Sequence, residues 1–202
     1  MGLNDPNPAD LPDEKLVELY RGGQTDAFAV LVRRYEKGLF HFLLRFVNKP
    51  AAADDVFQET FLQVHISIDS FDTSRSFRPW LFTIAANKAR DWLRRSKQQA
   101  SSALSTPIDA AAADGREFAD LLEADIPMPA DVAENRETQQ LVQKVVADMP
   151  DHLREILLLA YFERFAYKQI AEMLGLPLGT VKSRLHAAVA AFAELWKKSY
   201  PG

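Results

Sequence analysis

Apolar side chains recur every three or four residues along most of the chain, the spacing that places them on one face of an α-helix. The clearest run follows the turn sequence GGQTD, where Thr25 or Asp26 is expected to cap the helix. Its apolar positions are Phe28, Leu31, Val32, Tyr35, Leu39, Phe42, Leu43 and Phe46. No stretch of the sequence alternates polar and apolar residues as a half-buried strand would. The pattern predicts an all-α protein.

Helix breakers and a change in composition divide this helical pattern. Asn48-Lys49-Pro50 ends the first long helix, and AAADDVFQETFLQVHISI predicts the next, with Asp54 and Asp55 in its first turn. The loop IDSFDTSRS leads to a third helix, FRPWLFTIAANKARDWLRRS, and a short one, DEKLVELYRG, precedes them all. Residues 98 to about 135 are rich in Ala, Ser, Asp and Pro, and helical patterns then return. We therefore expect two small helical domains, 1–97 and 136–202, joined by a flexible acidic linker, 98–135.

Charge is unevenly distributed along these segments. The 202 residues carry a net charge of −4, and the segment 97–134 holds eight acidic and two basic side chains. The stretch from Arg75 to Lys97, in contrast, contains seven basic residues and a single acidic one, Asp91. A nucleic-acid partner is thus compatible with an acidic chain, because the positive charge is concentrated on one predicted helix.

Several classes of protein are disfavoured by what the sequence lacks. It has no cysteine, and its four histidines are scattered, so neither disulfides nor a metal centre are expected. No glycine-rich phosphate loop or nucleophile elbow is present, and we expect neither enzymatic activity nor a cofactor. The N-terminal sequence does not resemble an export signal and no long apolar run occurs, so we expect a cytoplasmic protein without membrane insertion.

A helix-turn-helix is predicted at about residues 167–187. YKQIAEMLG supplies the first helix, Gly175 its end, Leu176-Pro177-Leu178 the turn, and Gly179 the start of the second helix. At about 100° per residue, one side of the second helix is apolar: Val181, Leu185, Ala188 and Phe192. The opposite side carries Lys182, Ser183 and His186, with Arg184 at the border. These side chains can contact base edges or phosphates, or they can simply form the solvated face of a packing helix.

The basic helix that begins at Phe77 carries a second candidate surface. One stripe along it contains Trp80, Thr83, Asn87, Arg90 and Arg94. An aromatic ring, a hydroxyl, an amide and two guanidinium groups in line could follow a nucleic-acid backbone and stack against a base. Alternatively, Trp80 belongs to the core and the arginines are ordinary solvated charges.

The preceding helix, which contains DDVFQETFLQVH, combines apolar and acidic residues on its outer side. The predicted buried positions are Phe57, Thr60, Phe61, Val64 and Ile68. The far side carries Asp55, Glu59, Leu62 and Ile66, with Gln58 at its edge. An exposed leucine beside carboxylates indicates a protein-docking face. The alternative is that another part of the domain buries Leu62.

Together these segments resemble the extracytoplasmic-function (ECF) sigma factors, the compact class of bacterial RNA polymerase sigma subunits. DDVFQETFLQV is similar to the family's region 2.2, FRPWLFTIAANKARDWLRR to regions 2.3 and 2.4, and IAEMLGLPLGTVKSRLHAA to region 4.2. The resemblance covers nearly everything outside the termini and the linker. Family members often have Ser or Thr ahead of the last helix. Here Pro177-Leu178 stands there, and the helix is expected to start on Gly179 and Thr180.

The resemblance implies a role for each candidate surface. The positions that match the contact with the coiled-coil helices of polymerase β′ are Asp55, Gln58, Glu59 and Leu62. Those that match the −10 helix are Trp80, Asn87, Arg90 and Arg94, and the loop from Ser70 to Ser76 matches the one that captures a flipped base. Those that match the −35 helix are Thr180, Lys182, Ser183, Arg184 and His186.

The resemblance also implies partners and a function. They are core RNA polymerase, through its β′ coiled coil and β flap, promoter DNA, and an anti-sigma factor bound between the two domains. The implied function is promoter-specific initiation of transcription without catalysis. Two other functions stay open from the residues alone: a stand-alone helix-turn-helix regulator, which would not need the Phe77 helix, and a sigma-like module that sequesters a partner.

Overall fold

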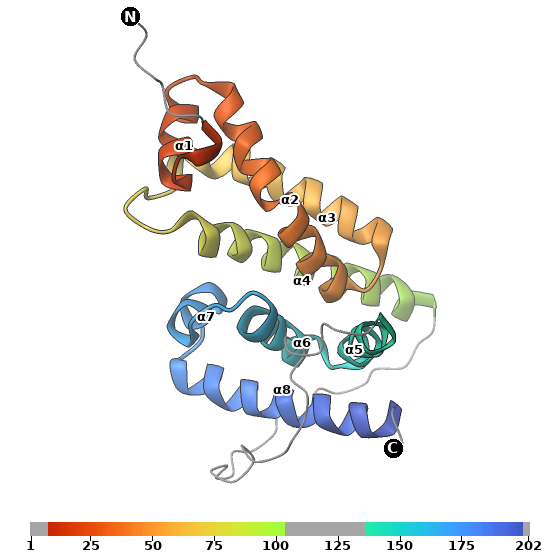
Figure 1. The fold of residues 1–202 in the computed structure, drawn as a ribbon. Helices are drawn as coiled ribbons and strands as arrows, with labels where there is room; N and C mark the ends of the chain where they lie inside the picture. The colour runs from red at the N-terminus through yellow and green to blue at the C-terminus, as the bar shows by residue number, and fades with distance from the viewer. Residues whose placement is uncertain (1–7, 104–135, 200–202) are drawn as a thin grey trace, which may run out of the picture.

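The computed structural model describes residues 8–103 and 136–199, which are helical almost throughout and contain no strand (Figure 1). This bears out the predicted all-α class. The first part contains the short 3₁₀ turn η1 (Pro8–Asp10), α1 (Asp13–Arg21), α2 (Thr25–Val47), α3 (Pro50–Ser67), the 3₁₀ turn η2 (Ile68–Ser70) and α4 (Phe77–Ala103). The second part contains α5 (Arg136–Asp148), α6 (Asp151–Leu157), the π-helical turn η3 (Leu158–Phe162), α7 (Tyr167–Leu174) and α8 (Leu178–Ser199).

The helices α1 to α4 form one bundle, the N-terminal bundle. Its core is built by the apolar faces of α2, α3 and α4, including Leu39, Phe42, Val56 and Leu81, all fully buried. Glu14 of α1 accepts a 2.9 Å hydrogen bond from the backbone N–H of Phe77, the first residue of α4. This contact satisfies a donor that a helix start leaves without an intrahelical partner, and it fixes where α4 begins.

Two details of the predicted helix starts in the N-terminal bundle are wrong. Neither Thr25 nor Asp26 caps α2, because the carbonyl of Gln24 already accepts the first helical bond, from Ala27. Asp54 and Asp55 lie beyond the first turn of α3, because that helix begins at Pro50. Proline suits the first helical position, where its missing N–H costs nothing. In addition, α4 continues past Lys97 to Ala103.

The helices α5 to α8 form the C-terminal bundle, whose last two helices make the predicted helix-turn-helix. Gly175 ends α7 in the left-handed conformation with φ of 63°, which a glycine adopts at little cost. The second helix begins at Leu178 rather than Gly179, and the carbonyl of Pro177 accepts the N–H of Val181 at 3.1 Å. The backbone of Pro177 therefore makes the first bond of the helix without a Ser or Thr side chain.

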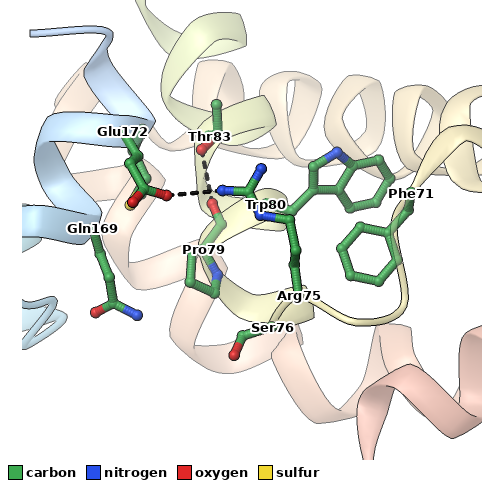
Figure 2. Close-up of a pocket in the computed structure, with 9 residues that line it drawn as sticks. Phe71, Arg75, Ser76, Pro79, Trp80, Thr83, Gln169 and Glu172 are labelled. Atoms are coloured by element: carbon green, nitrogen blue, oxygen red, sulfur yellow. Dashed lines mark hydrogen bonds and ion pairs between the residues drawn. The ribbon is translucent and has the colours of Figure 1, made fainter.

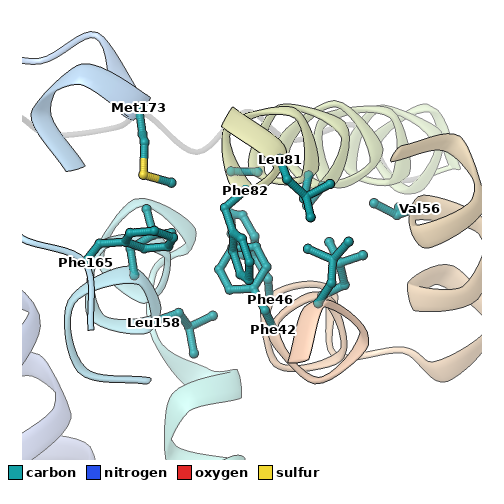
Figure 3. Close-up of a cluster of buried hydrophobic side chains, with 14 of the residues drawn as sticks. Phe42, Phe46, Val56, Leu81, Phe82, Leu158, Phe165 and Met173 are labelled. Carbon is teal, nitrogen blue, oxygen red and sulfur yellow. The ribbon is translucent and has the colours of Figure 1, made fainter. Parts of the chain in front are cut away.

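The two bundles pack directly against each other, with α4 facing the C-terminal bundle (Figure 1). Phe82 of α4 lies edge-on to Phe165, with ring centroids 5.3 Å apart, and Met173 lies near them (Figure 3). The buried guanidinium of Arg154 donates to the carbonyl of Phe46 in α2 at 2.7 Å. It also donates to three carbonyls at the end of α5: Val146, Ala147 and Met149. Apolar contact and a buried polar network thus join the bundles.

We expect Phe82→Ala to lower the free energy of unfolding by about 3–5 kcal/mol, because it leaves a cavity where two cores meet. Urea unfolding followed by circular dichroism measures the change. The control is Ile66→Ala, which truncates a side chain that is 66% exposed and should change stability by only about 0.5 kcal/mol. Equal losses for the two variants would contradict the described packing of Phe82.

Candidate nucleic-acid and protein interfaces

The outer face of α3 carries the exposed apolar residues that the sequence predicts. Leu62 is 59% exposed and Ile66 is 66% exposed, so the alternative that Leu62 is buried is excluded. Asp55 and Gln58 are exposed beside them, and the Glu59 carboxylate lies 3.7 Å from the guanidinium of Arg95 on α4. The four predicted residues line a single shallow depression together with Trp92, Arg95, Ser96 and Gln99. This depression between α3 and α4 offers apolar area inside a charged rim.

The predicted stripe of α4 is present, but its members have different surroundings. Trp80 is half-buried, with its ring 4.9 Å from that of Phe71 and 5.6 Å from that of Phe77. Asn87 is exposed and accepts a hydrogen bond from Arg90. Trp80 therefore packs partly within the bundle and stays partly accessible. The sequence left open whether it belongs to the core or to a nucleic-acid surface, and its position is compatible with both.

The loop before α4 forms one wall of a pocket of about 380 Å³. Phe71, Arg75 and Trp80 line it from the N-terminal bundle, and Gln169 and Glu172 of α7 line it from the other side (Figure 2). The Thr83 hydroxyl at its edge donates to the carbonyl of Pro79 at 2.8 Å. The pocket therefore combines an aromatic wall with polar groups, and α7 forms its second side.

The helix α8 divides into two faces as its sequence predicts. Val181, Leu185, Ala188 and Phe192 are all buried. Lys182, Ser183 and His186 are exposed, and Thr180 and Arg184 are half-buried. The Ser183 hydroxyl donates to the backbone carbonyl of Thr180 at 3.1 Å, which leaves its lone pairs free to accept. A cation, a hydroxyl and an imidazole thus stand together on one accessible surface.

A buried carboxylate, Glu155 of α6, lies close to both basic helices. It is 5% exposed, and one of its oxygens has no hydrogen-bond partner among the described residues. Burial raises the pKa of Glu155 to about 7, against the opposing charges of Arg90 and Arg184. The Arg90 guanidinium is 3.6 Å away. Glu155 therefore interacts electrostatically with two arginines of different predicted roles: Arg90 for the −10 element and Arg184 for the −35 element.

Sequence reasoning missed the acidic residues of the other bundle that pair with cations of α4 and of its preceding loop. They are Asp151, Glu155, Glu163 and Glu172, all in the C-terminal bundle. One signal was available, since Glu155 and Glu163 lie directly before and after the apolar run ILLLAYF. Which cations they meet depends on how the bundles pack, and no periodicity within a helix encodes that.

Comparison with known proteins identifies the two bundles. The model of Sigma-70 region 2 matches residues 31–99, and that of Sigma-70, region 4 matches residues 139–192. Two solved structures share the fold. CnrH, in complex with the cytosolic domain of CnrY, gives a TM-score of 0.65 at 24% identity over 93% of this chain and 99% of that one. RpoE of Bartonella quintana, in complex with the anti-sigma factor NepR, gives a TM-score of 0.62 at 23% identity, with 84% of this chain and 96% of that chain covered.

Curated relatives match along most of their length. The ECF RNA polymerase sigma factor SigW of Bacillus subtilis is 30% identical over 86% of this chain and 90% of its own. The ECF RNA polymerase sigma-E factor of Escherichia coli is 32% identical, with 88% and 91% covered. The fold and the two matched regions define a bacterial sigma subunit of the Sigma-70 class. More narrowly, the chain belongs to the ECF RNA polymerase sigma factors.

Membership gives the chain its general function. ECF sigma factors are specificity subunits that bind core RNA polymerase and promoter DNA. A stand-alone helix-turn-helix regulator would explain region 4 but not the match to region 2. Among the described residues, no helix is long and apolar enough to cross a membrane.

The raised pKa of Glu155 predicts a dependence of stability on pH. The folded chain keeps the Glu155 proton up to about pH 7, whereas an unfolded chain releases it near the ordinary value of 4.5. The contribution of this group to stability is therefore present below pH 4.5 and is lost as the pH rises to 7. We expect Glu155→Gln to gain stability over the wild type across this window, by up to about 3 kcal/mol.

Urea unfolding of both proteins at a series of pH values measures this difference. Taking the difference at each pH cancels the titration of other groups, such as His41 and His152, whose pKa values burial lowers. A difference that stays constant with pH would show that Glu155 does not titrate in this range.

Proposed function

We propose that this chain directs core polymerase to promoters through three surfaces. The first is the α3 face formed by Asp55, Gln58, Glu59 and Leu62, which contacts the β′ coiled coil. The second is α4 with its preceding loop, which contacts the −10 element through Trp80, Asn87, Arg90 and Arg94. The third is the start of α8, which contacts the −35 element through Thr180, Lys182, Ser183, Arg184 and His186.

The exposed position of Leu62 is the observation that carries this proposal. Leu62 is 59% exposed beside carboxylates, so a partner can cover its side chain without breaking a contact within the chain. Leucine packing against the partner, surrounded by a charged rim, is the usual arrangement of a protein interface. Because α4 lies next to α3, docking here would bring the basic helix close to DNA held by the polymerase.

The remaining parts of the proposal follow from the membership of this chain in the ECF sigma factors. Region 4 contacts the β flap, and the segment 98–135 links domains 1–97 and 136–202. The chain acts in the cytoplasm, where its polymerase is, without catalytic residues or a cofactor of its own. An anti-sigma factor is a further partner, as it is for RpoE of Bartonella quintana in its solved complex. Bound between the bundles, it would replace contacts such as that of Phe82 with Phe165.

The direct test is transcription in vitro with purified core polymerase on fragments of the source genome. We expect discrete transcripts that appear only when the chain is added, because a sigma subunit supplies promoter specificity that the core lacks. The products are resolved by gel electrophoresis and mapped at their 5′ ends. An identical set of products with and without the chain would refute the proposed function.

Two variants separate the polymerase and DNA surfaces. Leu62→Ala should weaken binding to a β′ coiled-coil fragment about 5- to 30-fold, the effect of losing a central interface contact, and leave duplex binding unchanged. Lys182→Ala should weaken binding to −35 duplex DNA. It should also reduce the slope of log affinity against log salt concentration by about one, the effect of losing one phosphate contact. Fluorescence anisotropy measures both affinities.

The matched control is Lys198→Ala, which removes an exposed lysine near the other end of α8. It should leave both affinities near those of the wild type. If Leu62→Ala and Lys182→Ala each weakened both interactions equally, the assignment of separate surfaces would be wrong.

A further inference from the structure

The helix α1 contacts both ends of the loop that precedes α4. It packs against η2, where the loop begins, and against α4, where the loop ends. Two side chains of α1 make the polar contacts, Arg21 at the beginning of the loop and Glu14 at its end. The loop from Ser70 to Ser76 belongs to the proposed −10 surface, so the side chains that support it affect that surface.

Arg21 binds the backbone at the beginning of the loop. Its Nε donates to the carbonyl of Ile68 at 3.1 Å, and its Nη2 donates to the carbonyls of Ile68 and Phe71. The planar guanidinium presents its donors in a rigid fork, so it fixes these two carbonyls relative to each other. The carboxylate of Asp69 is 4.0 Å away and 89% exposed, and it adds little to the contact. Because the acceptors are backbone carbonyls, Arg21 determines the path of the chain.

Glu14 binds the backbone at the end of the loop, where it accepts the N–H of Phe77 at 2.9 Å. A carboxylate at this place also interacts favourably with the dipole of α4. Phe77 is fully buried and Phe71 is 5% exposed, and their rings lie edge-on with centroids 5.6 Å apart. Polar and aromatic contacts therefore fix the same two points of the chain, with the largely exposed segment 72–76 between them.

The segment 72–76 forms a turn of its own. The side chain of Asp72 accepts the N–H of Ser74 at 2.9 Å, and the carbonyl of Asp72 accepts the N–H of Arg75 at 3.0 Å. A turn whose two ends are fixed has few alternative conformations. Binding a base then requires little further ordering of the loop, which favours tight and selective binding. The aromatic rings of Phe71 and Trp80 lie beside this turn (Figure 2).

The helix α1 is itself firmly attached to the N-terminal bundle. Leu16 and Val17 are fully buried in its core. A 2.6 Å hydrogen bond joins the Tyr20 hydroxyl to Nδ1 of His65 on α3. The helix can therefore act as a rigid support for the loop.

We propose that Arg21 and Glu14 are positioning residues for recognition of the −10 element. We define the loop brace as the hydrogen bonds of these two side chains with the backbone of Ile68, Phe71 and Phe77. The loop brace keeps the loop in the conformation that accepts a base of the promoter strand. The base preference of the chain thus depends on two side chains that act through the loop and do not themselves contact the base. This inference rests on the proposed function, since it concerns the same DNA surface.

Hydrogen exchange of the full chain tests the loop brace without polymerase or DNA. We expect Arg21→Ala to increase amide exchange in peptides that span residues 68–77 by at least about threefold, because the loop opens more often when its carbonyls lose their donor. Peptides from the cores of α2 and α3 should exchange as in the wild type. Deuterium uptake measured by mass spectrometry gives these rates.

The matched control is Lys15→Ala, which removes a cation from the same helix. Lys15 is 55% exposed and pairs with Glu18 on the surface of α1, so its loss should leave exchange in the loop unchanged. Unchanged exchange of residues 68–77 in Arg21→Ala would overturn the loop brace. So would an equal increase throughout the N-terminal bundle, since Arg21 would then support the bundle rather than the loop.

Base preference tests the consequence for recognition. Barcoded promoter templates with randomised −10 positions, and a second set with randomised −35 positions, are transcribed by polymerase carrying each variant, and the transcripts are sequenced. We expect Arg21→Ala to reduce the preference for the favoured base at one or two −10 positions about three- to tenfold, because the loop is correctly placed in only a fraction of complexes. The −35 preference should not change. A purely structural defect would instead lower transcription from all templates and leave both preferences intact.

Conservative variants show whether the hydrogen bonds are the cause. Glu14→Gln should keep the wild-type preference, because its amide oxygen can still accept the N–H of Phe77, whereas Glu14→Ala should reduce it. Arg21→Lys keeps the charge but loses the fork, so its preference should lie between those of the wild type and Arg21→Ala. An unchanged preference in both Arg21 variants, or equal reductions at −10 and −35 positions, would overturn the proposal.

The two experiments also separate this inference from the proposed function. If polymerase carrying the wild-type chain gave no promoter-specific transcripts, the proposed function would fail. Hydrogen exchange in Arg21→Ala and Lys15→Ala would then decide by itself whether α1 holds the loop.

Discussion

The contact between Phe82 and Phe165 is the interaction on which the arrangement of the molecule depends. It joins the two helical bundles at α4, which also contributes Leu81, Ala85 and Ala89 to the core of its own bundle. A helix is rigid on this scale, so one element takes part in the N-terminal core, the interdomain contact and two of the three proposed interfaces, the α3–α4 depression and the −10 surface. A change that repositions α4 therefore alters all of these surfaces together.

Ion pairs within this frame give several cations of α4 a partner in the other bundle. Arg78, Arg90 and Lys97 meet carboxylates of the C-terminal bundle. Burying a carboxylate disfavours its charged form, and the pKa of Glu155 is raised for this reason. A buried ion pair contributes little net stability, because desolvation offsets its attraction. Apolar contacts such as that of Phe82 with Phe165 therefore contribute more to holding the two bundles together.

The proposed surfaces occupy different sides of the chain, which matters for how a sigma subunit assembles. The α3 face around Leu62 is exposed, whereas Arg90 is paired with Glu155. Polymerase docking and DNA binding therefore need not occur together.

The sequence by itself determined the helices and most of their faces. Periodicity placed Val181 and Phe192 inside and Lys182 outside, because the face of a helical residue depends only on its local register. It also found the exposed Leu62. Helix starts were less predictable, since α3 begins at Pro50 and α8 at Leu178, where backbone carbonyls rather than capping side chains accept the first helical bonds. Only the tertiary structure decided that Arg90 meets Glu155 and that α7 bounds the pocket of Arg75, because pairing between bundles depends on long-range packing that no local pattern records.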